Sequence, residues 1–281
     1  MADIRVSSWS ELQDELFRGS WNEEIGRYRS PFVFRGLSDT IYPMDTSLMR
    51  LDGPYIELEK HLLRNFRKYA QSMAGELGSF WRLLTVAQHY GLPTRLMDWT
   101  YSPYVALHFA TENLTHYDAD GVIWVVNFHE VHKFLPTELR KLLESEGAQA
   151  FTVELLASLK LETECTTPDS SSFHEFVETL TEFDRLGAVE NFLLFFEPPS
   201  IDDRIINQFA LFSVMPNPRS RIDDWLNLHP EVFRRIIVPA ELKWECRDKL
   251  DQCNINERLL LPGLGGLCTW LKRHYSSGPQ S

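Results

Sequence analysis

The stretch AQHYGLPTRLMDWTYSPYVALHFA, residues 87–110, predicts a helix, a short strand and a second helix in direct succession. Gly91 follows a helical pattern that begins at Ser79, and a glycine at this place ends a helix in the left-handed conformation. Ser102 and Pro103 then form a helix start, because serine caps the first turn and proline fits its first position. Between the two helices, residues 94–99 are predicted to form the strand.

Other segments predict a sheet whose strands do not alternate regularly with helices. Strands are expected at residues 31–36, 122–127, 192–196, 204–214 and 234–238. Helices are expected from Ser8 or Ser10 to residue 17, over 55–73, over much of 130–190, and over 241–274 with breaks at 261–263 and 265–266. This order favours an α+β fold, a mixed and mostly antiparallel sheet flanked by helices.

The length and composition predict one globular domain with a buried core. The chain has 281 residues, 43% of them hydrophobic, which suits a single domain over residues 1–275. We expect 130–190 to be an acidic helical insertion and 276–281 to be a disordered tail. No signal peptide and no membrane-spanning stretch is visible, so the expected location is the cytoplasm. The four cysteines form no CxxC pair and are expected to be plain buried thiols: Cys165, Cys246, Cys253 and Cys268.

The net charge of −12 is concentrated in one part of the chain. Residues 161–203 hold eleven acids and one arginine, whereas residues 1–110 hold thirteen acids and twelve bases. The first part can therefore still bind a phosphate, although non-specific DNA binding is disfavoured. The acidic segment is interpreted as a solvated face or, alternatively, as a surface for a partner.

Arg35 and Gly36 end a predicted apolar strand. A guanidinium at the end of such a strand needs an anion beside it, and this anion is either a ligand or a carboxylate of the protein. Because glycine has no Cβ, we expect a ligand to approach the backbone at Gly36.

A second set of polar residues lies between the two helices of the opening stretch. Asp98, Thr100 and Ser102 alternate, which places them on one side of an extended segment. The start of a helix at Ser102 would attract an anion. Structural roles remain open for each group: a helix cap for His89, a turn contact for Asp98 and a core position for Trp99.

Several sequence blocks resemble the FRG family. Phe34-Arg35-Gly36 matches the motif that names it, and residues 87–110 resemble its second signature. Residues 120–124, 204–212 and 261–267 resemble later blocks.

The order of these blocks is similar to that of toxin-type ADP-ribosyltransferases, and the resemblance implies an NAD site without a metal. It implies catalytic roles for Arg35, Asp98, Ser102 and Gln208. It also implies an NAD-binding set of Arg35, Gly36, His89, Tyr90, Arg95, Trp99, Thr100 and Ser102. Arg35 would hold the diphosphate, and Gln208 stands on the expected last strand where such transferases usually place a glutamate.

Three functions are compatible with these residues. The first is NAD-dependent mono-ADP-ribosylation of a protein or a single-stranded nucleic acid. The second is a non-catalytic sensor that binds a nucleotide in a stress or phage-defence system, which Gln208 favours because an amide cannot stabilise a cation by charge. The third is a hydrolase that uses His89 and Asp98, and no metal-binding motif in the sequence supports it.

Overall fold

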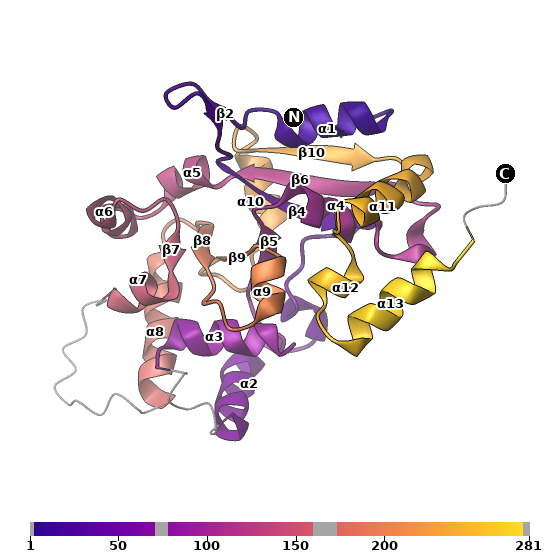
Figure 1. Ribbon diagram of the computed structural model, residues 1–281. Helices are drawn as coiled ribbons and strands as arrows, with labels where there is room; N and C mark the ends of the chain where they lie inside the picture. The colour runs from indigo at the N-terminus through magenta and orange to yellow at the C-terminus, as the bar shows by residue number, and fades with distance from the viewer. Residues whose placement is uncertain (1–2, 71–77, 160–172, 278–281) are drawn as a thin grey trace.

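A computed structural model describes residues 3–70, 78–159 and 173–277 of the chain. Its centre is an eight-stranded sheet in the order β1-β10-β6-β4-β5-β9-β8-β7 (Figure 1). Two neighbouring pairs at the ends of this order, β1–β10 and β7–β8, are parallel. The other five pairs are antiparallel. The predicted α+β class and the mixed, mostly antiparallel sheet are confirmed, and the sheet does not close into a barrel.

The strands of the main sheet and of one small hairpin are β1 (Ile4–Arg5), β2 (Trp21–Asn22), β3 (Arg27–Tyr28), β4 (Phe32–Leu37), β5 (Met97–Thr100), β6 (Gly121–Asn127), β7 (Phe151–Thr152), β8 (Leu194–Glu197), β9 (Ala210–Val214) and β10 (Phe233–Val238). The described α-helices are α1 (Trp9–Phe17), α2 (Tyr55–Tyr69), α3 (Phe80–His89), α4 (Pro103–Thr111), α5 (Phe128–Val131), α6 (Thr137–Glu146), α7 (Val153–Ser158), α8 (Phe173–Leu186), α9 (Asp203–Asn207), α10 (Ile222–Leu228), α11 (Lys243–Gln252), α12 (Glu257–Leu260) and α13 (Leu264–His274). Short 3₁₀ turns are η1 (Met49–Leu51), η3 (Leu114–His116), η4 (His132–Phe134) and η5 (Ala240–Leu242).

The predicted helix boundaries in the opening stretch are confirmed. The Ser79 and Ser102 side chains cap α3 and α4 by accepting hydrogen bonds from Arg82 N and Val105 N. Gly91 follows α3 with φ of +82°, a conformation that glycine adopts without steric strain. The first helix likewise starts after Ser8 rather than Ser10.

The central strands are buried on both faces. Along β6, Val122, Trp124 and Val126 pack into one core cluster, and Ile123 and Val125 pack into another. The second cluster takes its helical residues from α1, α4 and α11. A third cluster joins β8 and β9 to the helices α2, α3, α6, α7 and α8. The helices of the second and third clusters therefore lie over different parts of the sheet, and Figure 1 shows them near opposite ends of the strand order.

Residues 130–190 are mostly helical where they are described, but they also contain the short strand β7. Leu139, Phe151 and Leu180 are buried in the third cluster. Asp184 on α8 pairs with Arg95, so at least one acid of the 161–203 segment contacts the core rather than solvent. Residues 160–172, with Cys165, lie outside the described residues.

One predicted strand is partly wrong. Residues 204–214 do not form a single strand, because their first part is the helix α9 and only β9 is extended. Asp202 explains the difference: its carboxylate accepts hydrogen bonds from Arg204 N at 3.0 Å and Ile205 N at 3.2 Å. Such a cap favours a helix start over the strand preference of the following isoleucines. Phe209, with φ of +49°, then turns the chain into β9.

Two further predictions need correction. Gly265 and Gly266 do not break the last helix but lie inside α13, and a Cβ on Gly266 would meet Leu261 O at 1.9 Å. Glycine is thus required there for close packing of α13 on the end of α12. Of the described cysteines only Cys246 is buried, whereas Cys253 and Cys268 are exposed.

A search of the described residues finds no helix with the length and apolar character needed to cross a membrane.

Candidate functional site

A cavity opens where the sheet splits between β4 and β5. These two strands share one residue pair, Phe34 with Thr100, while β4 stays paired with β6 and β5 with β9. A cavity of about 500 Å³ lies at this split, within the range of small-molecule sites. It is lined by Phe34, Arg35, Gly36, Leu37, Ser38, Tyr42, Pro43, Arg50, Asp98, Trp99, Thr100, Phe109, Glu112, Arg204, Gln208 and Ala210.

Arg35 extends from β4 into this cavity and bridges the split. Its Nη1 donates a 2.6 Å hydrogen bond to the backbone oxygen of Asp98. Its buried Nε has no hydrogen-bond partner among the described residues. Burial lowers the pKa of Arg35, and the charge of Arg50 lowers it further against the opposing effect of Asp98. A desolvated guanidinium in this state is stabilised by any anion that enters.

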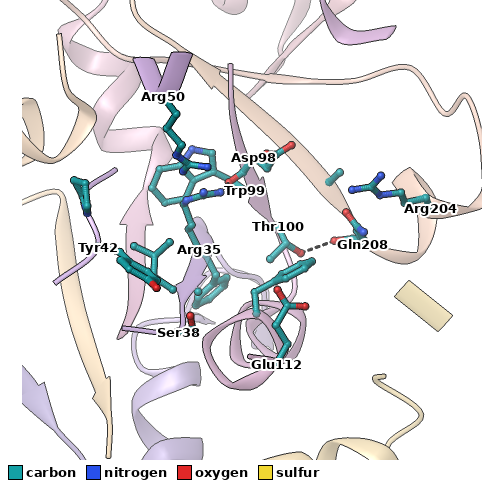
Figure 2. A pocket seen from close by; sticks show the side chains of 16 residues that line it. Arg35, Ser38, Tyr42, Arg50, Asp98, Trp99, Thr100, Glu112, Arg204 and Gln208 are labelled. Atoms are coloured by element: carbon teal, nitrogen blue, oxygen red, sulfur yellow. Dashed lines mark hydrogen bonds between the residues drawn. The ribbon is translucent and has the colours of Figure 1, made fainter. Parts of the chain in front are cut away.

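Two more arginines reach the cavity from other elements. Arg50 comes from η1 and donates through Nη2 to the backbone oxygen of Asp45 at 2.9 Å. Figure 2 shows its guanidinium next to that of Arg35, beside Trp99, while Arg204 reaches in from α9. Within the described ranges, no carboxylate oxygen lies within 4 Å of a guanidinium nitrogen of these three arginines. The cavity therefore offers positive charge that the protein does not neutralise by contact.

Two carboxylates also line the cavity. Asp98 on β5 accepts a hydrogen bond from Gln88 Nε2 at 3.1 Å. Glu112 is the C-cap residue of α4, and its Oε2 lies 3.4 Å from His108 Nε2. The lining thus carries both signs of charge, as a ligand with separated charges requires.

Gln208 lies at the end of α9, and its carboxamide is already engaged. Its Nε2 donates to Leu260 O at 2.9 Å, and its backbone oxygen accepts from Thr100 Oγ1 at 2.6 Å. The expectation that it stands on the last strand is wrong, because the cap at Asp202 makes this segment helical. Its side-chain oxygen and the second N–H of Nε2 are left for a ligand.

Aromatic rings form part of the walls, and two of the four are held by hydrogen bonds. Trp99 Nε1 donates to Ser213 Oγ at 2.8 Å, and Tyr42 Oη lies 2.7 Å from His116 Nε2. Phe109 projects from α4 into the same lining. Rigid rings of this kind can pack against a planar group.

The structure brings together Arg35, Gly36, Asp98, Trp99, Thr100 and Gln208 from the predicted set, but not the other four. Ser102 caps α4 away from the lining, so the helix start does not face Arg35 as expected. The opposite end of α4, with Phe109 and Glu112, lines the cavity instead.

The remaining predicted residues lie outside the cavity lining, where they contact other groups. His89 Nε2 pairs with Asp202 at 2.7 Å, and Tyr90 is exposed next to it. Arg95 is buried and forms a two-bond contact with Glu59 at 2.7 and 2.5 Å, together with a contact to Asp184. The space at Gly36 is also used differently than expected, since the Ala106 carbonyl of α4, not a ligand, occupies the place of a Cβ.

Sequence reasoning missed Tyr42, Arg50 and Glu112. Arg50 and Tyr42 lie in an irregular segment whose course no periodicity reveals. Glu112 could have been noticed in the sequence, because an acid directly after a helix interacts unfavourably with the helix dipole.

Comparison with known proteins identifies one domain family. The sequence model of the FRG domain matches residues 30–119. No curated protein and no solved structure matches the chain. The matched range contains the whole cavity lining except Arg204, Gln208 and Ala210. The chain therefore carries an FRG domain over residues 30–119, and the cavity is largely a feature of that domain.

Proposed function

We propose that this cavity binds NAD and transfers its ADP-ribose to an acceptor group on a protein or a nucleic acid. The observation that carries the proposal is the pair of neighbouring guanidinium groups, Arg35 and Arg50, without a carboxylate in contact. Two like charges kept together in a half-enclosed site are unfavourable unless an anion joins them. A diphosphate supplies two negative charges on adjacent phosphates.

The rest of the lining suits the other parts of NAD. Trp99 and Phe109 offer apolar ring faces for a planar base. The side-chain oxygen of Gln208 is available to a ribose hydroxyl. During transfer, the bond between C1 of the ribose and the nicotinamide nitrogen breaks, and its electron pair stays on the ring nitrogen. The acceptor oxygen or nitrogen then bonds to C1 and releases its proton.

A second candidate function is favoured by the engaged carboxamide of Gln208. A non-catalytic domain that senses a nucleotide would use the same arginines and would need no charged group at the ribose. The two candidates differ in turnover, not in binding.

The test combines binding and product formation with the full chain and NAD. We expect an NAD-dependent rise in melting temperature and free nicotinamide in chromatography. Arg35→Met should lose the shift, because a charge-assisted contact contributes about 1.5–3 kcal/mol to binding. Arg29→Ala is a matched control, since Arg29 is exposed and outside the cavity.

Three results separate the candidates. Both signals support the transferase, provided that they disappear in Arg35→Met and persist in Arg29→Ala. A melting shift without nicotinamide supports the sensor. The absence of both signals over a wide range of pH and NAD concentration would rule out NAD as the ligand.

A further inference from the structure

Glu112 stands out among the groups that line the cavity. It is the C-cap residue of α4 and is half-buried. Across residues 3–70, 78–159 and 173–277, its carboxylate has His108 Nε2 as a neighbour at 3.4 Å, and no lysine or arginine nitrogen lies within 4 Å of it. The other carboxylate of the lining, Asp98, is in contrast held by Gln88.

The helix dipole disfavours a carboxylate at this position. The carbonyl end of a helix carries partial negative charge, so an adjacent carboxylate costs about 0.3–1 kcal/mol rather than adding stability. Residues that break a local rule without a structural gain are often explained by function. A cationic group of a ligand would remove the cost.

The ring of His108 faces the Glu112 carboxylate. Which nitrogen of this ring carries the proton follows from its second neighbour, Arg247. Arg247 Nη1 lies 2.7 Å from His108 Nδ1. Since a guanidinium only donates, Nδ1 accepts, and a neutral ring then carries its proton on Nε2. This Nε2 is the atom 3.4 Å from Glu112 Oε2. Burial lowers the pKa of His108, and Arg247 also lowers it while Glu112 opposes the shift, so the ring stays neutral near pH 7. His108 can thus orient Glu112 without neutralising it.

The placement of charge in the cavity gives the carboxylate a partner in NAD. Figure 2 shows Glu112 rising from α4 below Thr100, apart from the Arg35 and Arg50 guanidinium pair. NAD has the same division, with a negative diphosphate and a positive nicotinamide ring joined by a ribose. A ligand whose diphosphate meets the arginines therefore extends its nicotinamide ribose toward Glu112.

We infer that Glu112 is the catalytic carboxylate of the cavity and that His108 positions it, an inference that rests on the proposed transferase function. In the reaction, the carboxylate stabilises the positive charge that develops on the ribose as the bond to nicotinamide breaks. It also takes the proton of the acceptor group that bonds to C1. Glu112 thereby supplies the charge that Gln208 lacks, from a helix end rather than from a strand.

The experiment compares Glu112→Gln with unmodified protein and with Glu144→Gln, a change at an exposed glutamate outside the cavity. Nicotinamide release should fall by about 10²-fold or more in Glu112→Gln, as expected for loss of a base and of a charge at the transition state. The Kd for NAD should change by no more than about threefold, because the amide keeps the shape of the side chain. Glu112→Asp should retain part of the activity. This variant replaces Glu112→Gln in the test if the amide variant does not fold.

The positioning role of His108 has its own readout. His108→Gln should lower kcat and leave the KM for NAD unchanged. In a Glu112→Gln background the same change should have no further effect on kcat, because residues that act as a unit are not additive. A further loss of activity in the double variant would show that His108 acts only through stability, and this would overturn its role.

The outcomes distinguish this inference from the proposed function. Nicotinamide release that persists at the normal rate in Glu112→Gln overturns the role of Glu112 and leaves the transferase function intact. Unmodified protein that binds NAD but releases no nicotinamide removes the transferase function, and the catalytic role of Glu112 with it.

Discussion

Two arginines of this chain, the half-buried Arg35 and the buried Arg95, differ in what surrounds them. Arg95 is fully enclosed and contacts Glu59, Asp184 and the backbone oxygen of Pro216. Burial alone would lower its pKa, but the two carboxylates raise it above the ordinary value. Arg35 has one backbone oxygen as a hydrogen-bond partner, and burial lowers its pKa although the charge of Asp98 opposes this effect.

The difference shows that some buried charged residues stabilise the fold whereas others are available to bind a ligand. Arg95 belongs to the scaffold, and its guanidinium has carboxylate and backbone partners within the protein. In the cavity, Arg35 and Arg50 have backbone oxygens as partners but no carboxylate of the described residues, which is a state that a ligand can relieve. The following predictions test this division.

The largest effect is expected when Arg95 is replaced. Arg95→Met should lower the free energy of unfolding by about 3–5 kcal/mol, because removal of one partner leaves buried Glu59 uncompensated. Arg35→Met should change it by less than about 1 kcal/mol, since no carboxylate depends on that guanidinium. Urea denaturation of both variants measures the difference. Equal losses would contradict the division between scaffold and cavity.

A second effect concerns His132, a scaffold group whose partners fix its charge. Its Nδ1 lies 3.0 Å from Gln149 O, and its Nε2 accepts from Phe195 N at 3.0 Å. Burial lowers the pKa of His132 to about 4. Above pH 6.5 the ring is neutral in both the folded and the unfolded state. As the pH falls from 6.5 to 4, only the unfolded state gains the proton, and stability falls by about 3 kcal/mol.

Denaturation at several pH values checks the role of His132. The fall between pH 6.5 and 4 should be smaller in His132→Asn than in the unmodified protein. His61→Asn is the control, because His61 is exposed, and it should keep the full fall. If both variants keep the same pH dependence, His132 does not titrate as proposed.

The smallest effect is expected at Gln208, which belongs to both regions. Gln208→Glu should destabilise the protein by about 1–2 kcal/mol, because a carboxylate cannot donate to Leu260 O and would repel it. We also expect no gain in nicotinamide release. An increase in release with unchanged stability would show that Gln208 belongs to the binding machinery and not to the scaffold.

Much of the fold could be predicted from short-range signals. Caps such as Ser79 and Ser102 and the glycine at 91 act within one turn of the chain, so their effects are visible in the sequence. The prediction of one strand over residues 204–214 was wrong because two local signals compete there. The cap at Asp202 favours a helix, the residues Ile205 and Ile206 favour a strand, and the helix forms.

The site was only partly predictable because its geometry depends on long-range contacts. Arg35 and Asp98 were expected together and do meet in the cavity. Ser102 was expected there because the sequence shows where α4 starts but not which of its ends faces β4. Arg95 could not be recognised as a structural residue, since its partners Glu59 and Asp184 lie 36 and 89 positions away.

The close contact at Gly36 limits how the cavity can vary. A Cβ at this position would lie 1.8 Å from the carbonyl oxygen of Ala106, so β4 and α4 touch backbone to backbone beside Arg35. Neither element can shift toward the other, and no larger residue fits between them. The wall that joins Arg35 to Glu112 is therefore fixed in shape. Adaptation to a different ligand has to occur on the other side, where the exposed side chains of Tyr42, Arg50 and Arg204 can be exchanged without disturbing the core.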